Sequence, residues 1–259
     1  MTNFEKAIEF NKSFGVFVSD TVVRDIFDTN PSLSKLRLSL IVEEINELMD
    51  AFSTRNFVEV IDALADILVV VYGAGASFGI NLDNKYEYLL ANCEGDNNYE
   101  ITRNLLIKFK KVELVNSLTN IFDNTVLSEE LQELLDTTLK SVVFYRDELK
   151  DAHDKKDMDK FSVCLLKIIE FTYTISCVLG IDIQRSYQIV HDSNMSKLCS
   201  DEQEAKDTVS WYQNNQTRYD SPAYKKSDDG INWVVFNNST GKILKSIKYI
   251  PANFDCLLN

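Results

Sequence analysis

Residues 40–52 have the sequence LIVEEINELMDAF, and this stretch decides the fold. At about 100° per residue its apolar side chains, three or four positions apart, form one stripe of a helix. Glu44 and Glu47 lie just beside that stripe, and Glu43 lies further round. The pattern predicts a helix with one face in the core and a row of carboxylates along the edge of that face.

A second acidic stretch follows at residues 59–72, with the sequence EVIDALADILVVVY. Glu59, Asp62 and Asp66 share one stripe, and the other faces are almost wholly apolar. A helix that is apolar nearly all round is expected to be buried, and an isolated buried charge is very costly. The carboxylates therefore require cations, and hard divalent ions fit best because all-oxygen ligands suit Mg²⁺ or Mn²⁺ rather than zinc.

Two other interpretations of the acids remain open from the residues alone. Acidic runs usually form a solvated face, and Arg24, Arg37 or Arg55 could supply ion pairs. Carboxylate-rich bundles build metal sites from acids at i, i+3 and i, i+4 on two helices, and both stretches have that spacing. We therefore expect metal binding.

Composition limits the class of protein. The chain has 259 residues, enough for a substantial core and one or two domains, and its 8 Gly and 3 Pro favour mostly helical structure. A net charge of −13 repels nucleic acid. Five scattered cysteines without a C-x-x-C pair indicate reduced thiols. The N-terminus has no signal pattern, and the longest apolar run, 67–78, is too short for a membrane span. We expect a cytoplasmic protein with neither nucleic acid nor membrane as a partner.

Apolar periodicity predicts an all-α bundle with a small β-hairpin near the C-terminus. The hairpin is expected to pair residues 233–236 with residues 242–247 across a Gly-containing turn. The predicted helices cover about 3–14, 33–54, 57–78, 84–92, 99–122, 128–153, 158–179, 183–191 and 201–216.

An internal repeat relates two parts of the chain. Gly79-Ile80 recurs as Gly180-Ile181, an offset of 101 residues, and gapless matches at this offset run from Leu38 and Leu139 to Tyr86 and Tyr187. The second copy keeps Glu148 in place of Glu47, but Phe144, Tyr145, Val163 and Lys167 replace Glu43, Glu44, Asp62 and Asp66. We expect two tandem related halves, a single-chain pseudo-dimer. The predicted units are a first repeat with the metal ligands at 1–98, a degenerate second repeat at 99–218, and a hairpin and tail at 219–259.

These residues resemble the all-α nucleoside triphosphate pyrophosphohydrolases, the MazG-like, dimeric dUTPase-like and phosphoribosyl-ATP pyrophosphohydrolase-like group. The family signature is Glu-x-x-Glu on one helix and Glu/Asp-x-x-Asp on the next. Glu44-x-x-Glu47 matches the first half, and Glu59-x-x-Asp62 with Asp66 resembles the second. The spacing departs from many members, which carry an acid where position 63 has alanine.

The resemblance extends from residue 9 to residue 251 and is interrupted by the second copy. In one branch of the superfamily a Gly-Ile-Asp turn leads directly to a Val-His-x-Ser-Asn-Met-Ser-Lys segment, which here follows the second copy at residues 190–197. Further matching segments are Glu9-Phe10, Phe14-Gly15, Arg37-Leu-x-Leu-Ile41, Val71-Tyr72-Gly73, Gly241-Lys242-x-x-Lys245, Tyr249 and Pro251.

The resemblance implies an Mg²⁺-dependent hydrolase (Mn²⁺ as the alternative) that converts a nucleoside or deoxynucleoside triphosphate to the monophosphate and pyrophosphate. Because family members usually dimerise, the linked copies imply a monomeric pseudo-dimer or a homodimer. A catalytically weak or inactive nucleotide-sequestering protein is the main alternative, and a purely structural helical module ranks last. The implied catalytic residues are Glu43, which is expected to hold the attacking water, Glu44 and Glu47; the metal ligands are Glu44, Glu47, Asp62, Asp66 and Glu59; and the substrate-binding residues are Asn194, Lys197, His191, Lys242, Lys245 and Tyr249.

Overall fold

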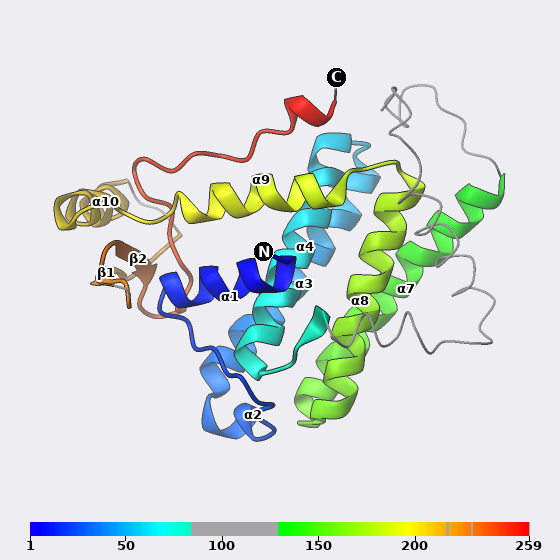
Figure 1. Ribbon diagram of the computed structural model, residues 1–259, viewed down its shortest axis with the longest axis horizontal. Coiled ribbons are helices and arrows are strands. Elements are labelled where there is room, and N and C mark those ends of the chain that lie inside the picture. The colour runs from blue at the N-terminus through cyan, green and yellow to red at the C-terminus, as the bar shows by residue number, and fades with distance from the viewer. Residues whose placement is uncertain (84–128, 216–217, 229, 259) are drawn as a thin grey trace.

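The computed structural model describes residues 1–83, 129–215, 218–228 and 230–258 (Figure 1). Within these ranges the chain is mostly helical with one two-stranded sheet, so the expected all-α class is confirmed. The predicted helices at 84–92 and 99–122 lie outside the described residues. The helices are α1 (Asn3–Ser13), α2 (Ile26–Thr29), α3 (Pro31–Ser53), α4 (Phe57–Phe78), α7 (Glu129–Asp154), α8 (Met158–Val178), α9 (Ile183–Met195), α10 (Glu202–Asn214) and the 3-10 helix η1 (Asp255–Leu257).

The acidic helices α3 and α4 form a tightly linked antiparallel pair. Asn30 caps α3 by accepting from the N–H of Leu33, and Asn56 caps α4 by accepting from the N–H of Glu59. Helix α4 ends at Gly79, which has a φ of 71°. A Cβ there would lie 1.9 Å from the carbonyl oxygen of Thr21, so only glycine fits this close approach.

Helices α7 and α8 repeat this arrangement 101 residues later. The α3–α4 turn contains Arg55 with a φ of 54°, and the α7–α8 turn contains Lys156 with a φ of 56°. Asp157 caps α8 as Asn56 caps α4. After the second pair, Gly180 repeats the positive φ of Gly79. The two helix pairs therefore correspond in element order and in their turns.

The two helix pairs pack against each other through equivalent residues. The hydroxyl groups of Tyr72 and Tyr173 lie 3.3 Å apart, so each copy contributes the same residue to one buried contact. Leu48 and its counterpart Leu149 are both fully buried. Tyr86, the repeat partner of Tyr187, lies outside the described residues. So does the predicted boundary at residue 98, and the three-unit division stays a prediction.

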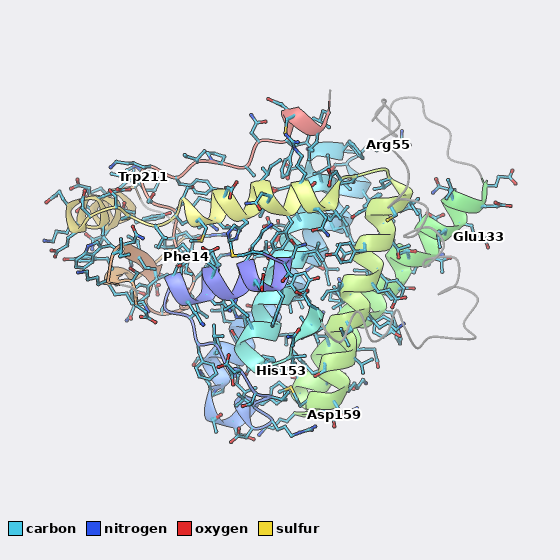
Figure 2. The ribbon with its side chains drawn as sticks, viewed as in Figure 1. Phe14, Arg55, Glu133, His153, Asp159 and Trp211 are labelled. Carbon is cyan, nitrogen blue, oxygen red and sulfur yellow. The ribbon has the colours of Figure 1, made fainter. Side chains whose placement is uncertain are left out.

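Helices α1 and α9 cover the α3–α4 pair on the side where the C-terminal segment returns (Figure 1). In the described ranges, α8 is the one helix with the length and hydropathy of a membrane span. However, 78% of its most apolar window is buried inside the molecule, as in the core helix of a globular bundle. His153, near the end of α7 (Figure 2), is largely buried and packs edge-on against Phe27 at 5.3 Å between ring centroids.

The β-hairpin is present, but its full-length partner strand is not the expected one. The expected pairing is limited to the start of residues 242–247, where the Asn237 N–H donates to the Lys242 carbonyl at 2.8 Å and the Leu244 N–H to the Val235 carbonyl at 2.9 Å. Strand β1 (Pro222–Lys226) pairs antiparallel with β2 (Trp233–Asn237). The segment 242–247 makes a single bridge to β2, at Ile243. Beyond it the chain turns toward α9 and α10, because the Ile247 N–H donates to the Thr208 hydroxyl at 3.2 Å and the Ser246 hydroxyl to the Ser196 carbonyl, also at 3.2 Å.

Candidate active site

One cavity of about 590 Å³ lies between α1, α3, α4, α9 and the C-terminal segment. It collects acids from α3 and α4 and basic and amide groups from α9 and the C-terminal segment. Glu59 does not line it; this side chain is exposed on the first turn of α4. The predicted site residues that do line the cavity are Glu43, Glu44, Glu47, Asp62, Asp66, His191, Asn194, Lys197, Lys242, Lys245 and Tyr249.

Glu44, Asp62 and Asp66 lie half-buried in the cavity, whereas Glu47 at its wall is exposed. Burial raises the pKa of Glu44 to about 9, and Asp66 is the charged neighbour that adds most to this rise. Burial, followed by the charge of Asp62, raises the pKa of Asp66 to about 7. Burial, followed by Glu59 and Glu47, raises the pKa of Asp62 to about 6. These shifts have the direction expected for carboxylates that lack a sufficient counter-charge.

The chemistry of this group fits a hard divalent cation. Glu44 Oε2 is buried and has no hydrogen-bond partner among the residues that the structure describes, which leaves a carboxylate oxygen available to an ion. The surrounding donors are all carboxylate oxygens, the ligands that Mg²⁺ and Mn²⁺ prefer. In the described ranges, however, no three His, Cys, Asp or Glu side chains stand close enough together to form a ready-made metal cluster.

Lysines approach the acids from elements far away in the sequence. Lys242 forms an ion pair with Glu43 at 3.1 Å, so the acid that we expected to hold the attacking water has a cationic partner. Lys197, at the end of α9, donates to the amide oxygen of Asn194. Burial lowers the pKa of Lys197, while the charge of Asp66 opposes this effect. The cavity thus places lysines opposite the acids. Among the described residues, however, Glu44 forms no ion pair with any of these lysines.

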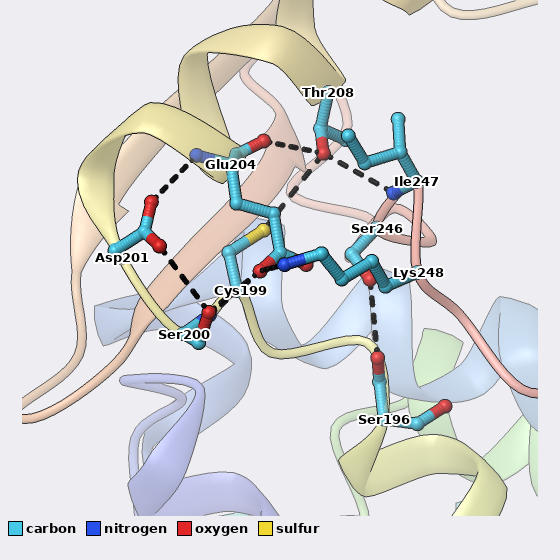
Figure 3. Close-up of polar contacts among 9 residues, drawn as sticks. All are labelled: Ser196, Cys199, Ser200, Asp201, Glu204, Thr208, Ser246, Ile247 and Lys248. Atoms are coloured by element: carbon cyan, nitrogen blue, oxygen red, sulfur yellow. Dashed lines mark hydrogen bonds and ion pairs between the residues drawn. The ribbon is translucent and has the colours of Figure 1, made fainter.

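A polar network fixes the C-terminal segment that carries Lys242 and Lys245. Glu204 on α10 is buried and accepts from Lys248 at 3.1 Å and from the Ser200 hydroxyl at 2.8 Å (Figure 3). The Thr208 hydroxyl and the Ser196 carbonyl hold the backbone of residue 247 and the side chain of residue 246, as described above (Figure 3). This network lies beside the cavity and determines where the two lysines enter it.

The remaining predicted substrate residues are also held in place. His191 Nε2 lies 3.2 Å from a carboxylate oxygen of Glu9 on α1, and burial lowers the pKa of His191. The Tyr249 hydroxyl accepts from Ser193 at 2.9 Å. The ammonium group of Lys245 lies 4.5 Å from the centre of the Tyr249 ring.

Arg24 and Arg37, which the alternative interpretation offered as partners of the acids, bind other groups. Arg24 pairs with Asp159 on α8 at 3.0 Å. Arg37 is buried and donates to Asn11 and Ser77, which are both neutral. Arg37 and Asn11 line the cavity, a role that sequence analysis missed although Arg37 lies two helical turns before Glu44 on the same face. Arg218 and Tyr219, also at the cavity wall, gave no signal in the sequence.

Comparison with known proteins identifies a family whose matched region contains the acids of the cavity. A family model described as phosphoribosyl-ATP pyrophosphohydrolase matches residues 9–91, which include the five cavity acids. Uncharacterized protein L479 of Acanthamoeba polyphaga mimivirus is 35% identical over 266 residues, covering 99% of this chain and 96% of the relative. That match runs through both helix pairs. No solved structure matches. The chain belongs to the MazG-like superfamily of nucleoside triphosphate pyrophosphohydrolases.

Proposed function

We propose that this protein is an Mg²⁺-dependent nucleoside triphosphate pyrophosphohydrolase, which converts an NTP or dNTP to the monophosphate and pyrophosphate. The observation that carries the proposal is one cavity in which acids of α3 and α4 face Lys197, just after α9, and two lysines of the C-terminal segment. A triphosphate with bound cations matches both walls, because its metal ions meet carboxylates and its free oxygens meet ammonium groups.

Glu44, Glu47, Asp62 and Asp66 would hold the Mg²⁺ ions, whereas Glu59 does not line the cavity. Mn²⁺ would fit the same oxygen donors. When bound, the ions would supply charge neutralisation of the phosphates and a lowered pKa for a water molecule. Glu44 contributes the buried oxygen that is otherwise without a partner in the described part of the chain.

The protein's own groups would complete the reaction. A water attacks the α-phosphorus, the bond from this phosphorus to the oxygen of the β-phosphate breaks, and a carboxylate among Glu43, Glu44 and Glu47 accepts the water proton. Glu43 is our choice for this base, and its ion pair with Lys242 holds its carboxylate in place. Lys197, with Lys242 and Lys245, would stabilise the charge on the leaving pyrophosphate. Asn194 would offer both a donor and an acceptor to the substrate.

The test is pyrophosphate release from a panel of NTPs and dNTPs, with Mg²⁺, with Mn²⁺ and with a chelator. We expect release that requires the metal ion, with one nucleotide site per chain. The panel also tests the second candidate, a sequestering protein, which is favoured by the absence of a ready-made metal cluster in the described residues. Nucleotide binding without pyrophosphate release in any metal would support that candidate and overturn the hydrolase.

The cellular setting is part of the proposal. We propose a cytoplasmic enzyme that acts on the nucleotide pool, either as a monomeric pseudo-dimer or as a homodimer, with a nucleoside triphosphate as its partner. The net charge of −13 supports the proposal that the protein does not bind nucleic acid.

A further inference from the structure

Arg37 is a buried cation that the proposed reaction does not use. It is 6% exposed, and its interactions in the described part of the chain are hydrogen bonds to two neutral side chains. Nη2 donates to Asn11 Oδ1 at 2.7 Å, and Nε donates to Ser77 Oγ at 3.2 Å. A guanidinium group carries five N–H donors, so donors remain on Nη1 and Nη2 at the cavity wall.

The surroundings hold this guanidinium in a fixed orientation. The amide of Asn11 donates to the Gly73 carbonyl at 3.0 Å and to Ser77 Oγ at 3.4 Å, so both partners of Arg37 are themselves fixed. Gly73 makes room for the group, because a Cβ there would lie 3.2 Å from Nη1. This pre-organisation is typical of a residue that recognises a ligand rather than one that fills the core.

Arg37 and the acids occupy opposite ends of one cavity. Arg37 lies seven residues before Glu44 on α3, and Gly73 lies seven residues after Asp66 on α4. At 1.5 Å per residue, each separation is roughly 10 Å along the helix. The wall between the two ends is apolar, formed by Leu40, Val69 and Val70, with Phe10 on α1 also lining the cavity.

This layout separates the two ends of a nucleotide. The lysines gather around the acids and not around Arg37, so the phosphates belong at the acidic end. A triphosphate at Arg37 would instead lie against aliphatic side chains. The sugar and the flat faces of a base suit the apolar wall, and the edge of the base then meets the free N–H groups of Arg37.

We propose that Arg37, oriented by Asn11 and Ser77, recognises a carbonyl-bearing edge of the nucleobase, so that keto bases are preferred over adenine. This inference rests on the proposed function. Guanine is expected to be best because its O6 and N7 accept two N–H groups of one arginine. Thymine and uracil offer a single carbonyl toward the same donors. Adenine presents its N6 amino group, a donor facing donors, and would leave buried N–H groups unpaired.

Inosine and adenosine triphosphates provide the sharpest test, because they have nearly the same shape and differ in the keto or amino group at the purine edge. For the wild type we expect a kcat/KM about 10- to 100-fold higher for inosine triphosphate. Arg37→Gln should reduce this ratio to within about threefold, mainly by raising KM for inosine triphosphate. Gly73→Ala, which pushes a methyl group onto Nη1, should reduce the ratio in the same direction without altering the arginine. Arg24→Gln, at an exposed arginine paired with Asp159, is the matched control and should leave the ratio unchanged.

Methyl triphosphate, which lacks a base, separates base recognition from the other roles of Arg37. We expect Arg37→Gln to hydrolyse it at the wild-type rate. An equal loss with methyl triphosphate, or equal kcat/KM for both purines in the wild type, would overturn the inference. If the wild type releases no pyrophosphate from any nucleotide, the proposed function fails instead. Calorimetric binding then decides the inference: tighter binding of inosine triphosphate that is lost in Arg37→Gln supports it, and equal binding of both purines overturns it.

Discussion

The helix pairs α3–α4 and α7–α8 share one backbone arrangement but differ in their charged residues. In the first pair, Glu44 and Asp66 are half-buried near each other, and their pKa values rise. Their counterparts in the second pair are Tyr145 and Lys167, a half-buried aromatic and a lysine. The arrangement therefore does not depend on these acids.

The second pair neutralises Glu148 and Lys167 within its own helices. Lys167 forms an ion pair with Glu170 one turn later at 2.9 Å. Glu148, the counterpart of Glu47, forms one with Lys160 at 2.7 Å. In the first pair the lysines come instead from just after α9 and from the C-terminal segment. The raised pKa values of Glu44 and Asp66 indicate that these acids lower the stability of the fold, which is typical of acids at a functional site.

The largest expected effect concerns the acids themselves. Glu47→Ala or Asp66→Ala should lower the rate of pyrophosphate release about 1,000-fold or more, because each removes a proposed metal ligand. Circular dichroism should show unchanged helix content. The matched control is Glu148→Ala at the equivalent position of α7, which should alter the rate by less than about twofold and stability by less than about 1 kcal/mol. Near-normal activity of either first-pair variant would mean that the ligand assignment is wrong.

The next effect concerns the stability of the metal-free protein. The pKa values of Glu44, Asp62 and Asp66 are raised to about 9, 6 and 7, so between about pH 4 and pH 9 these three groups bind more protons in the folded chain than in the unfolded chain. The free energy of unfolding in a chelator should therefore decrease as the pH rises through this window. Thermal unfolding from pH 5 to pH 9 measures it.

A neutral substitution isolates the contribution of one acid to this pH dependence. At pH 8 in a chelator, Glu44→Gln should raise the free energy of unfolding by at least about 1.4 kcal/mol, the equivalent of one pKa unit. For a chain of this size that corresponds to several degrees in Tm. Glu148→Gln, in the second pair, should give no such gain. A Tm that is constant or rises with pH would contradict half-buried, mutually repelling acids.

A smaller effect is expected at the ion pair of Lys242 with Glu43. Lys242→Ala should lower kcat/KM about three- to tenfold, since the pair is partly exposed and such pairs contribute modestly. Lys206→Ala removes a comparable pair with Glu202 on α10, outside the cavity, and serves as the control. Equal kcat/KM values for the two variants would show that Lys242 does not contribute to the site.

The smallest expected difference is in the number of nucleotides bound per chain, one rather than two. Calorimetry with a non-hydrolysable nucleotide and Mg²⁺ should give one site per chain, because the second pair lacks the acids. Two equivalent sites would break the contrast between the helix pairs.

Sequence analysis located the helices better than the hairpin. The bounds of α3, α4 and α8 were predicted to within about two residues, because helical periodicity and caps such as Asn30 and Asn56 are local signals. Strand β1 was missed since its sequence, PAYKK, has little of the alternation that marks a strand. Turn chemistry suggested residues 242–247 as the partner of β2, but β1 pairs with it along its length.

The candidate site shows the same division between local and long-range information. The acid stripe was visible because spacing on a helix fixes which residues share a face. The role of Arg37 was not visible, because it depends on Asn11 and Ser77, 26 and 40 positions away in the chain. Glu59 shares the stripe of Asp62, yet it is exposed and does not line the cavity, since burial depends on what packs over the end of a helix.

The covalent link between the two helix pairs has a consequence for evolution and for assembly. In an association of two identical chains, every substitution appears on both sides of the interface. Here the contact of Tyr72 with Tyr173 forms within one polypeptide, so either side can change alone. The same link holds the halves together at any dilution, because their encounter depends on tether length and not on how many molecules are present.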